Sequence, residues 1–567
     1  MYTSHGSYRK KEVISSFHPA VYYLILLIVC CFAFIINNQV IPADLMESRN
    51  LATAQEMVRE GNYLVPTMNG ELRLEKPPLP TWIAAGVEKL IPGNLMVQRC
   101  MAGLSATLMV IFLYLTGTCL TRNRNIGLLT ALILATCFNV VLMGRTATWD
   151  IYCHSFMTGA IYFFLVAFGE RGKQWGNFLA AGLFLGLSFL SKGPVSFYAL
   201  LLPFLISYIL VLHPSLRGKK APLFCMILIA VIVSCWWMIY ILIFHSDMAL
   251  AIAQKESTSW INHNVRPWYY YWQFPAEAGI WALFLVTSVI YYFTYKKQEY
   301  RREYTFSILW LILSLILLSL IPEKKTRYLL PILVPASLSV AFYIYYQIKC
   351  GLTRGEKFLF RLNAFVIAII LLGIPVALYL MFFRQGEMSL LIVSITGVLS
   401  WGLALFIFIS IYNRGGIQAK AVFVAIILTM IMIESVCLLP IGDMFINDDR
   451  HSIRMLRDNE QVAGLPFFYN PEEGLLRMEL VYEANKTIRP IDLSQDAVIY
   501  DHLPFVLVSG MPIDSLMAGK LVEIEWIDQF DNNWRKVGHK RHNPELVREV
   551  AIIRGMEVQP EPEPVEE

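Results

Sequence analysis

Long apolar segments run through the first 439 residues of this chain and constrain what it can fold into. About thirteen of them approach the roughly 20 apolar residues that an α-helix needs to cross a bilayer. The chain is 56% hydrophobic and only 16% charged, whereas soluble domains carry about 25% charged residues. This composition predicts a mostly α-helical, polytopic membrane protein. The predicted spans lie near residues 19–38, 100–120, 126–143, 151–168, 176–191, 194–212, 221–243, 278–295, 305–321, 328–347, 360–382, 389–412 and 419–438.

Basic residues in the loops orient these helices, because the cytoplasmic loops of membrane proteins are enriched in Lys and Arg. With the N-terminus inside, every loop on the inner side is basic. The sequence therefore predicts a cytoplasmic N-terminus and places everything after residue 439 on the outer face. The inner-loop residues behind this prediction are Arg122, Arg124, Arg171, Lys173, Arg217, Lys219, Lys220, Lys296, Lys297, Arg301, Arg302, Lys349, Arg354, Lys357, Arg414 and Lys420.

The composition changes after residue 439, which predicts a second domain. Polar stretches there alternate with short apolar runs, a pattern typical of a small α/β domain. None of the ten cysteines lies in this region, so it has no disulfide framework. We therefore expect a transmembrane domain at 1–439 with a polar outer loop at 39–99, an α/β domain at 440–558 and a disordered tail at 559–567.

The polar outer loop concentrates charge in an otherwise apolar chain. Residues 49–60 have the pattern of an amphipathic helix, and Gly61 follows them as a typical C-cap. Glu75 and Lys76 come next, before two prolines that hold the backbone in extended geometry. A loop of this kind presents its charges from a rigid frame. We interpret it as half of an active site at the membrane surface.

Cations in the other outer loops break the rule that such loops are poor in Lys and Arg. Ionisable residues at membrane depth are costly and mark functional sites. Cations beside carboxylates suit a lipid-linked phosphate, because they neutralise the phosphate while a carboxylate accepts a proton. The unexpected cations are Arg145, Lys192, Arg266, Lys324, Lys325 and Arg327.

Each of these charges also has a purely structural interpretation. Asp44 and Glu47 are equally explained as solvated loop charges, and Asp150 as a carboxylate that favours a helix N-terminus. Lys192 can extend from a helix end to the interface, and the aromatic run at 268–272 is typical of an interfacial belt. The gathering of the unexpected charges on one predicted face favours a functional interpretation.

The loop motifs resemble those of the bacterial aminoarabinose lipid A transferases. These are membrane glycosyltransferases of the GT-C fold, glycosyltransferase family 83, related to the protein O-mannosyltransferases. By motif, the resemblance covers the chain to about residue 330. The matching motifs are Glu47-Ser-Arg-Asn-Leu-Ala-Thr-Ala-Gln-Glu-Met, Gly61-Asn-Tyr-Leu-Val-Pro, Asn69-Gly70, Glu75-Lys-Pro-Pro-Leu, Arg145-Thr-Ala-Thr-Trp-Asp150, Ser191-Lys-Gly-Pro, His263 with Arg-Pro-Trp-Tyr-Tyr, and Thr326-Arg-Tyr-Leu-Leu-Pro.

The resemblance implies an inverting glycosyltransferase with a periplasmic active site and a polyprenyl-phosphate sugar donor. The sugar would be aminoarabinose or another pentose or hexose, and the acceptor lipid A or another envelope glycan or protein. It also implies a multi-pass protein of the bacterial inner membrane with a periplasmic C-terminal domain. No nucleic-acid partner is expected.

One departure from the family concerns the catalytic carboxylate. Aligning on the Glu75 motif puts Met46 where the family has an aspartate. Glu47 is therefore the predicted base and Asp44 the second choice, with Asp150 positioning sugar or acceptor. The residues that the resemblance assigns to the donor phosphate are Lys76, Lys192 and Arg327, supported by Lys324, Lys325 and Arg266.

Glu75 and His263 match family positions for a divalent metal ion, and a carboxylate with an imidazole suits zinc. Two ligands alone make a poor zinc site, so an ion pair of Glu75 with Lys or Arg is the alternative. Arg145 is a candidate partner for Asp150.

The sequence leaves three rival functions, of which a membrane anchor for the C-terminal domain is disfavoured by the charges embedded between the spans. A protein O-glycosyltransferase or another glycan-modifying GT-C enzyme would share the donor class and differ in the acceptor. A transporter of lipid-linked sugars would place its binding residues near the bilayer midplane, often in inverted repeats. The charges here lie at one predicted surface, and no repeat is visible in the sequence, which favours an enzyme.

Overall fold

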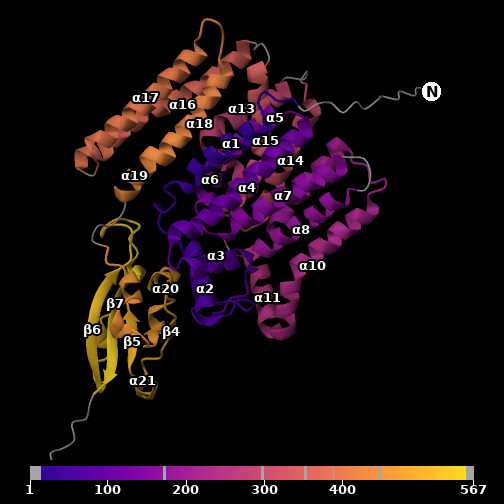
Figure 1. Cartoon of the computed structure of the whole chain (residues 1–567). Helices are drawn as coiled ribbons and strands as arrows, with labels where there is room; N and C mark the ends of the chain where they lie inside the picture. Colours follow the sequence, from indigo (N-terminus) through magenta and orange to yellow (C-terminus); the bar gives the residue numbers. More distant parts are fainter. Residues whose placement is uncertain are drawn as a thin grey trace, which may run out of the picture. The chain divides into compact units, whose positions relative to one another are not determined.

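The computed structural model describes residues 14–169, 174–262, 264–294, 299–349, 354–386, 388–444, 447 and 450–556. The chain divides into two compact units (Figure 1). We call the first the helical unit; it comprises Met1–Val40, Leu74–Ile83 and Ile91–Ile441. We call the second the mixed unit; it comprises Ile41–Arg73, Ala84–Leu90 and Gly442–Glu567. Most of the polar loop near the N-terminus thus groups with the C-terminal segment.

Apolar helices make up the helical unit, as the long apolar segments predict. The helices that lie wholly in this unit include α1 (Pro19–Cys30), α4 (Leu95–Thr121), α5 (Arg124–Ala135), α6 (Phe138–Gly144), α7 (Trp149–Gly169), α8 (Trp175–Lys192), α9 (Leu202–Ser207), α10 (Lys220–Phe244), α11 (Ser246–Asn262), α12 (Phe274–Glu277), α13 (Ala282–Thr294), α14 (Arg301–Leu320), α15 (Leu333–Lys349), α16 (Arg354–Met381), α17 (Leu390–Ile411) and α18 (Ala419–Met432). The short π and 3-10 turns between them include η1 (Cys31–Ile35), η2 (Phe197–Leu201), η3 (Tyr208–Leu212), η4 (Trp268–Gln273), η6 (Thr326–Ile332) and η8 (Ile433–Cys437). Helices α3 (Leu79–Leu90) and α19 (Leu438–Met444) belong partly to this unit and partly to the second one.

Eight helices of the described residues are long and apolar enough to cross a membrane, or up to ten if each of two bent pairs is one span. The pair α5 and α6 bends by 68°, and the pair 268–277 and 279–294 bends by 99°. The break after α5 falls at Thr136, whose hydroxyl donates to the carbonyl of Leu132, a contact that often bends helices. The polytopic, mostly helical fold class is confirmed, and the number of spans stays a prediction.

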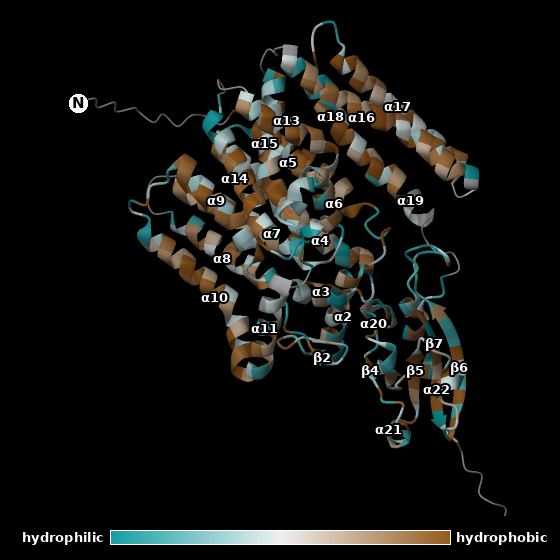
Figure 2. Ribbon diagram, turned by 180° about the vertical axis from the view of Figure 1, so that it is seen from behind, coloured by the Kyte–Doolittle hydropathy of each residue, from teal (hydrophilic) through white to brown (hydrophobic). Residues whose placement is uncertain are grey.

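Burial separates central helices from peripheral ones. The helical segment Thr326–Lys349, which contains α15, has 94% of its most apolar window buried, whereas α10 has 22%. Figure 2 shows that α10, α16 and α17 are largely hydrophobic along their length. Because a helix that is apolar all round needs an apolar environment, the exposed faces of these peripheral helices suit lipid.

A five-stranded sheet forms the centre of the mixed unit. The strand order is β4-β3-β5-β7-β6, with β3 parallel to β4 and β5, and β7 antiparallel to β5 and β6. Helices α20 (Met478–Ala484), α21 (Asp496–His502) and α22 (Ile513–Leu516) accompany it, which confirms the predicted small α/β fold of the C-terminal segment. The strands are β3 (Phe467–Tyr469), β4 (Ile488–Pro490), β5 (Phe505–Ser509), β6 (Val522–Asp531) and β7 (Val547–Gly555).

Helix α2 (Leu45–Glu60) and the short strands β1 (Thr67–Met68) and β2 (Glu71–Leu72) complete the mixed unit. The helix begins four residues earlier than the predicted 49–60. The reason is local, because Asp44 caps it and accepts a hydrogen bond from the backbone N–H of Glu47, at 2.8 Å. Gly61 ends it as predicted, in the left-handed conformation with φ of +77°.

Candidate active site

Three ionisable side chains gather in the helical unit where α7 begins, α8 ends and η6 lies. Lys192 Nζ donates a hydrogen bond to Asp150 Oδ1 and forms an ion pair with it. The Asp150 side chain is 3% exposed and that of Lys192 is 7% exposed. The ring centre of Tyr328 is 5.2 Å from Lys192 Nζ and 5.7 Å from Arg327 Cζ. We call Asp150, Lys192, Arg327 and Tyr328 the cationic cluster.

The cationic cluster has an excess of positive charge. It holds two cations and one carboxylate, and Arg327 lies within electrostatic range of Asp150. Arg327 Nε is buried and has no hydrogen-bond acceptor among the described residues. A buried donor without an acceptor costs about 1–3 kcal/mol and is rare in folded proteins. An anion bound at the cluster would accept from this nitrogen and balance the charge.

The loop after α14 is held against the segment that follows α11. Val265 pairs with Glu323 in an isolated antiparallel bridge. Lys324 Nζ donates to the carbonyl oxygens of Arg266, at 3.2 Å, and Ile321, at 2.5 Å. Burial lowers the pKa of the Lys324 ammonium. These contacts show Lys324 bracing the loop through backbone carbonyls.

The other predicted phosphate residues of this loop have different surroundings. Lys325 Nζ forms an ion pair with Glu323, at 2.5 Å, and lies 5.7 Å from the ring centre of Tyr328. Arg266 is exposed. The structure thus brings Lys192, Lys325 and Arg327 together around one aromatic ring.

An apolar cavity of about 940 Å³ lies among α7, α8, η2, α9, η3 and α10. Phe189 and Pro194, which line it, precede and follow Lys192 in the sequence. Its lining on α10 extends from Leu223 to Cys235, about 18 Å of helix. Ligand sites of proteins commonly measure about 300–1,000 Å³. The space is therefore large enough for a long apolar chain.

Arg145 has a structural position away from the cationic cluster. It forms a buried ion pair with Glu434, at 2.8 Å, so the expected pairing of Arg145 with Asp150 is wrong. The reason lies in η1, the π-helical turn that ends the first helical segment and leaves carbonyl groups without helical partners. The guanidinium donates to the carbonyl oxygens of Ala33, at 2.7 Å, and of Ile36 and Phe32, at 2.8 Å each.

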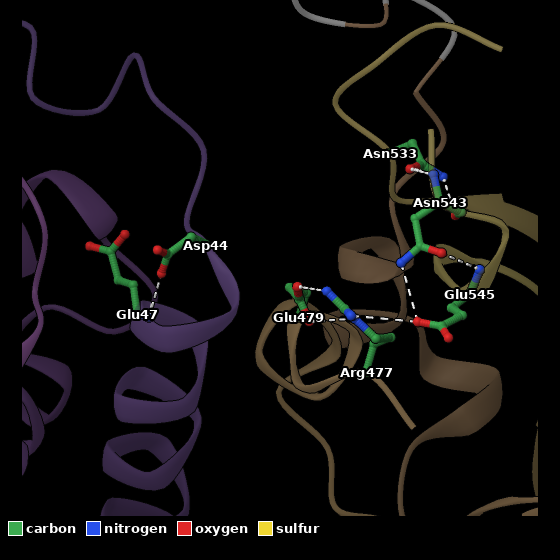
Figure 3. A network of polar contacts seen from close by, with 7 residues as sticks. All are labelled: Asp44, Glu47, Arg477, Glu479, Asn533, Asn543 and Glu545. Carbon is green, nitrogen blue, oxygen red and sulfur yellow. Dashed lines mark hydrogen bonds and ion pairs between the residues drawn. The ribbon is translucent and has the colours of Figure 1, made fainter. Parts of the chain in front are cut away.

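Two carboxylates lie at the first turn of α2 in the mixed unit (Figure 3). Asp44 is the exposed N-cap, and its side chain is engaged by the Glu47 N–H. Glu47 is 0% exposed, and its carboxyl group lies on the same side of the turn as that of Asp44. Acidic side chains are common at the N-cap and in the first turn of helices. Asp44 thus has a capping role, and Glu47 is the buried acid.

The predicted metal ligands do not form a complete site among the described residues. Glu75 and Lys76 are both partly buried in the segment between β2 and α3, and His263 lies outside the described residues. Within the described ranges, no three His, Cys, Asp or Glu side chains gather as a metal-binding group. Glu75 alone does not satisfy a tetrahedral zinc ion, so the zinc site stays a prediction.

His154 is a buried ionisable residue that lies outside the motifs identified in the sequence. It lies one helical turn after Asp150 on α7 and is 1% exposed, and its Nδ1 has no hydrogen-bond partner among the described residues. A signal was present, because residues four apart share a helix face and a histidine inside an apolar span marks function.

Comparison with known proteins gives partial sequence matches. The model of a family described as dolichyl-phosphate-mannose-protein mannosyltransferase matches residues 75–239. An uncharacterised protein of Aquifex aeolicus is 28% identical over 289 residues, 50% of this chain and 56% of that protein. The undecaprenyl phosphate-alpha-4-amino-4-deoxy-L-arabinose arabinosyl transferase of Yersinia enterocolitica is 28% identical over 317 residues, 52% of this chain and 54% of that protein. The chain thus spans little more than half the length of these curated relatives.

The fold has a match over nearly the whole chain. The crystal structure of ArnT from Cupriavidus metallidurans bound to undecaprenyl phosphate superposes with a TM-score of 0.68 and 14% identity. The match covers 94% of this chain and 97% of that one. It confirms the predicted GT-C type of fold, and with the sequence matches it confirms the resemblance to the aminoarabinose transferases.

Proposed function

We propose that this protein is an inverting glycosyltransferase that uses a polyprenyl-phosphate sugar donor. Its sugar would be aminoarabinose or another pentose or hexose, and its acceptor an envelope molecule such as lipid A. The observation that carries this proposal is the cationic cluster together with an apolar cavity of about 940 Å³, whose lining residues Phe189 and Pro194 flank Lys192 in the sequence. The name of the Yersinia relative and the undecaprenyl phosphate bound to the Cupriavidus protein support it.

A polyprenyl phosphate has a long apolar chain and an anionic head, and the helical unit offers a surface for each. Apolar area buried in the cavity contributes about 25 cal/mol per Å². Lys192 and Arg327 donate to the phosphate oxygens, and charge-assisted hydrogen bonds of this kind are the strong ones. Lys76 and Lys325 are the supporting cations. Together these contacts would hold the donor by both of its ends.

The proposed chemical step is a direct displacement at the sugar. An acceptor oxygen attacks the anomeric carbon, and the bond from that carbon to the phosphate oxygen breaks with both electrons leaving on the phosphate. Lys192 and Arg327 stabilise the charge that develops on this leaving group. Asp150 holds the Lys192 ammonium in place through the buried ion pair. The attack inverts the anomeric configuration and forms no covalent enzyme intermediate.

Glu47 is the proposed base that takes the proton from the acceptor oxygen or orients that oxygen. It is a buried carboxylate in the first turn of α2. Asp44 is the weaker candidate because its carboxylate already accepts from the Glu47 N–H. Asp150 is the next carboxylate in line, although its charge is matched by Lys192.

A protein acceptor is the second candidate, since the matched family model is described as a protein mannosyltransferase. The two acceptors are distinguished by mass spectrometry of lipid A and of envelope proteins from cells with and without this protein. We expect a mass difference of one sugar on lipid A. The same mass difference on an envelope protein would instead support the protein acceptor. If neither lipid A nor any envelope protein changes in mass, both acceptors are contradicted.

The proposed orientation has a cytoplasmic N-terminus and a periplasmic C-terminal domain in the inner membrane. A cysteine placed at Lys520 should react with an impermeant thiol reagent added from outside, whereas one placed at Glu299 should not. Labelling of the second position from outside would overturn this orientation.

A further inference from the structure

An asparagine side chain completes the edge of the sheet in the mixed unit. Strand β4 is the first strand in the sheet order, so one of its sides is open. Asn69 Nδ2 donates to the carbonyl oxygen of Ile488, and Asn69 Oδ1 accepts from the Ile488 N–H, each at 2.7 Å. The carboxamide thus occupies the place that the peptide group of a further strand would take.

Helix α2 fixes the turn that carries this asparagine. Glu56, which is 1% exposed, accepts from the N–H of Asn69, at 2.7 Å, and from that of Gly70, at 2.9 Å. Both turn residues have positive φ, +59° and +81°, as the tight turn of an Asn-Gly hairpin requires. Hydrogen bonds therefore connect α2 to the turn and the turn to β4.

Arg59 makes a second link from α2 to the same segment. It donates to the carbonyl oxygen of Asn485, at 3.1 Å, and to Thr487 Oγ1, at 2.5 Å. Helix α20, which ends just before Asn485, packs along α2. The linked residues are 419 to 428 positions apart in the sequence, so this junction is a tertiary one.

Tyr482 of α20, the helix that packs along α2, interacts electrostatically with Glu47. Burial raises the pKa of the Tyr482 phenol on α20, and the negative charges of Glu483 and Glu47 raise it further. Glu47 therefore lies within electrostatic range of α20.

Helix α20 is itself held in the C-terminal domain by a polar network (Figure 3). Arg477 forms ion pairs with Glu479, at 2.6 Å, and Glu545, at 3.5 Å. Asn543 Nδ2 also donates to Glu545, at 3.2 Å. The surface against which α2 rests is thus braced by the segment between β6 and β7.

We propose that the contacts of Arg59 and Asn69 with residues 482–488 form a junction that fixes the position of Glu47. Through this junction, the C-terminal domain would determine the position of the base. This inference rests on the proposed function, in which Glu47 is the base. A shift of about 1 Å in a catalytic group can cost about 100-fold in rate. Loosening the junction should therefore lower kcat and leave donor binding intact.

The test uses the full-length protein and substitutions on both sides of the junction. Asn69→Ala removes the sheet-edge contact, and Thr487→Val removes the hydroxyl that accepts from Arg59 while keeping the side-chain shape. We expect each to lower kcat by about 10- to 100-fold, with KM for the donor unchanged. Thr487→Ser keeps the hydroxyl and should restore most of kcat.

Arg554→Ala is the matched control, because it removes an arginine contact with Glu525 on β6, at the other edge of the same sheet. It should leave kcat and KM unchanged. Melting temperatures of all variants separate loosening of the junction from unfolding. A kcat loss that appears only together with a large fall in melting temperature would overturn the inference.

A double substitution separates this inference from the proposed function. In a Glu47→Gln background, Asn69→Ala should cause no further loss of kcat, because the group that it positions is already removed. If Glu47→Gln is inactive while Asn69→Ala and Thr487→Val keep wild-type kcat, the inference fails and the proposed base stands. If Glu47→Gln is fully active, the proposed base fails and the inference fails with it.

Discussion

The cationic cluster of the helical unit and the first turn of α2 in the mixed unit use charge in different ways. In the cluster, Lys192 and Asp150 are buried in apolar surroundings and paired across 42 positions of sequence. At the turn, Asp44 satisfies a backbone N–H only three residues away. Burying an ion pair carries a desolvation cost wherever its partners lie in the sequence, and ionisable residues at membrane depth are functional candidates. Local pairing serves the helix that contains it.

The difference separates unexpected charges that gather as a candidate site from those that stabilise the fold. In the helical unit the rule identifies the cluster, but it also selects Arg145, whose role is to bind Glu434 and the freed carbonyls of η1. In the mixed unit, Asp44 and Glu56 secure local turns of the loop. The contacts of each charged side chain distinguish a candidate binding site from a structural ion pair.

Removing the proposed base tests whether the first turn of α2 takes part in catalysis as well as in helix capping. Glu47→Gln keeps the side-chain shape and should lower the rate of sugar transfer by about 10²- to 10⁴-fold, the usual contribution of a general base. Donor binding, measured with the same purified protein, should be retained. Transfer at the wild-type rate would remove Glu47 from the chemistry.

Breaking the Arg145 brace should affect stability more than kinetics. Arg145→Ala leaves the buried carboxylate of Glu434 without its cation, and loss of one partner of a buried pair costs about 3–5 kcal/mol. We expect a clear fall in the melting temperature of the detergent-solubilised protein. The protein that remains folded should keep its KM for the donor, and a raised KM would instead place Arg145 in the binding site.

Removing a cluster cation should weaken use of the donor. Lys192→Ala and Arg327→Ala each remove a charge-assisted contact worth about 1.5–3 kcal/mol, so kcat/KM should fall by about tenfold to several hundredfold. Arg384→Ala, which removes an exposed cation of another loop, is the control and should have no effect. Full activity in either cluster variant would exclude that residue from donor binding.

The smallest effect is expected at Asp44. Asn is as good an N-cap as Asp, so Asp44→Asn should keep both stability and activity, whereas Asp44→Ala should destabilise the protein by about 1 kcal/mol. Thermal unfolding of the two variants measures the difference. An inactive Asp44→Asn protein with normal stability would mean that the Asp44 charge itself takes part in catalysis.

Much of the fold is predictable from the sequence because apolar length is a local property. The helical segments, the Gly61 C-cap and the C-terminal sheet all follow from patterns within short windows. The start of α2 is also predictable from the sequence, since Asp44 and Glu47 have the spacing of a capping box.

Partners distant in sequence were not predictable in the same way. Glu434 is the single acidic residue in the apolar run at 419–438, which marks it, but no local pattern indicates Arg145 as its partner. The contact of Asn69 with Ile488 joins positions 419 residues apart. Such pairs depend on how the elements pack, and a single sequence does not encode that in any short window.

Turnover of the sugar donor by the purified protein is the direct test of the proposed glycosyltransferase activity. The protein in lipid nanodiscs is given undecaprenyl-phosphate-linked aminoarabinose together with lipid A, and mass spectrometry follows both lipids. We expect free undecaprenyl phosphate and lipid A heavier by one sugar in equal amounts, with both products strongly reduced in the Lys192→Ala variant. An intact donor after incubation with protein that binds it, tested with lipid A and with envelope proteins as acceptors, would contradict the proposed activity.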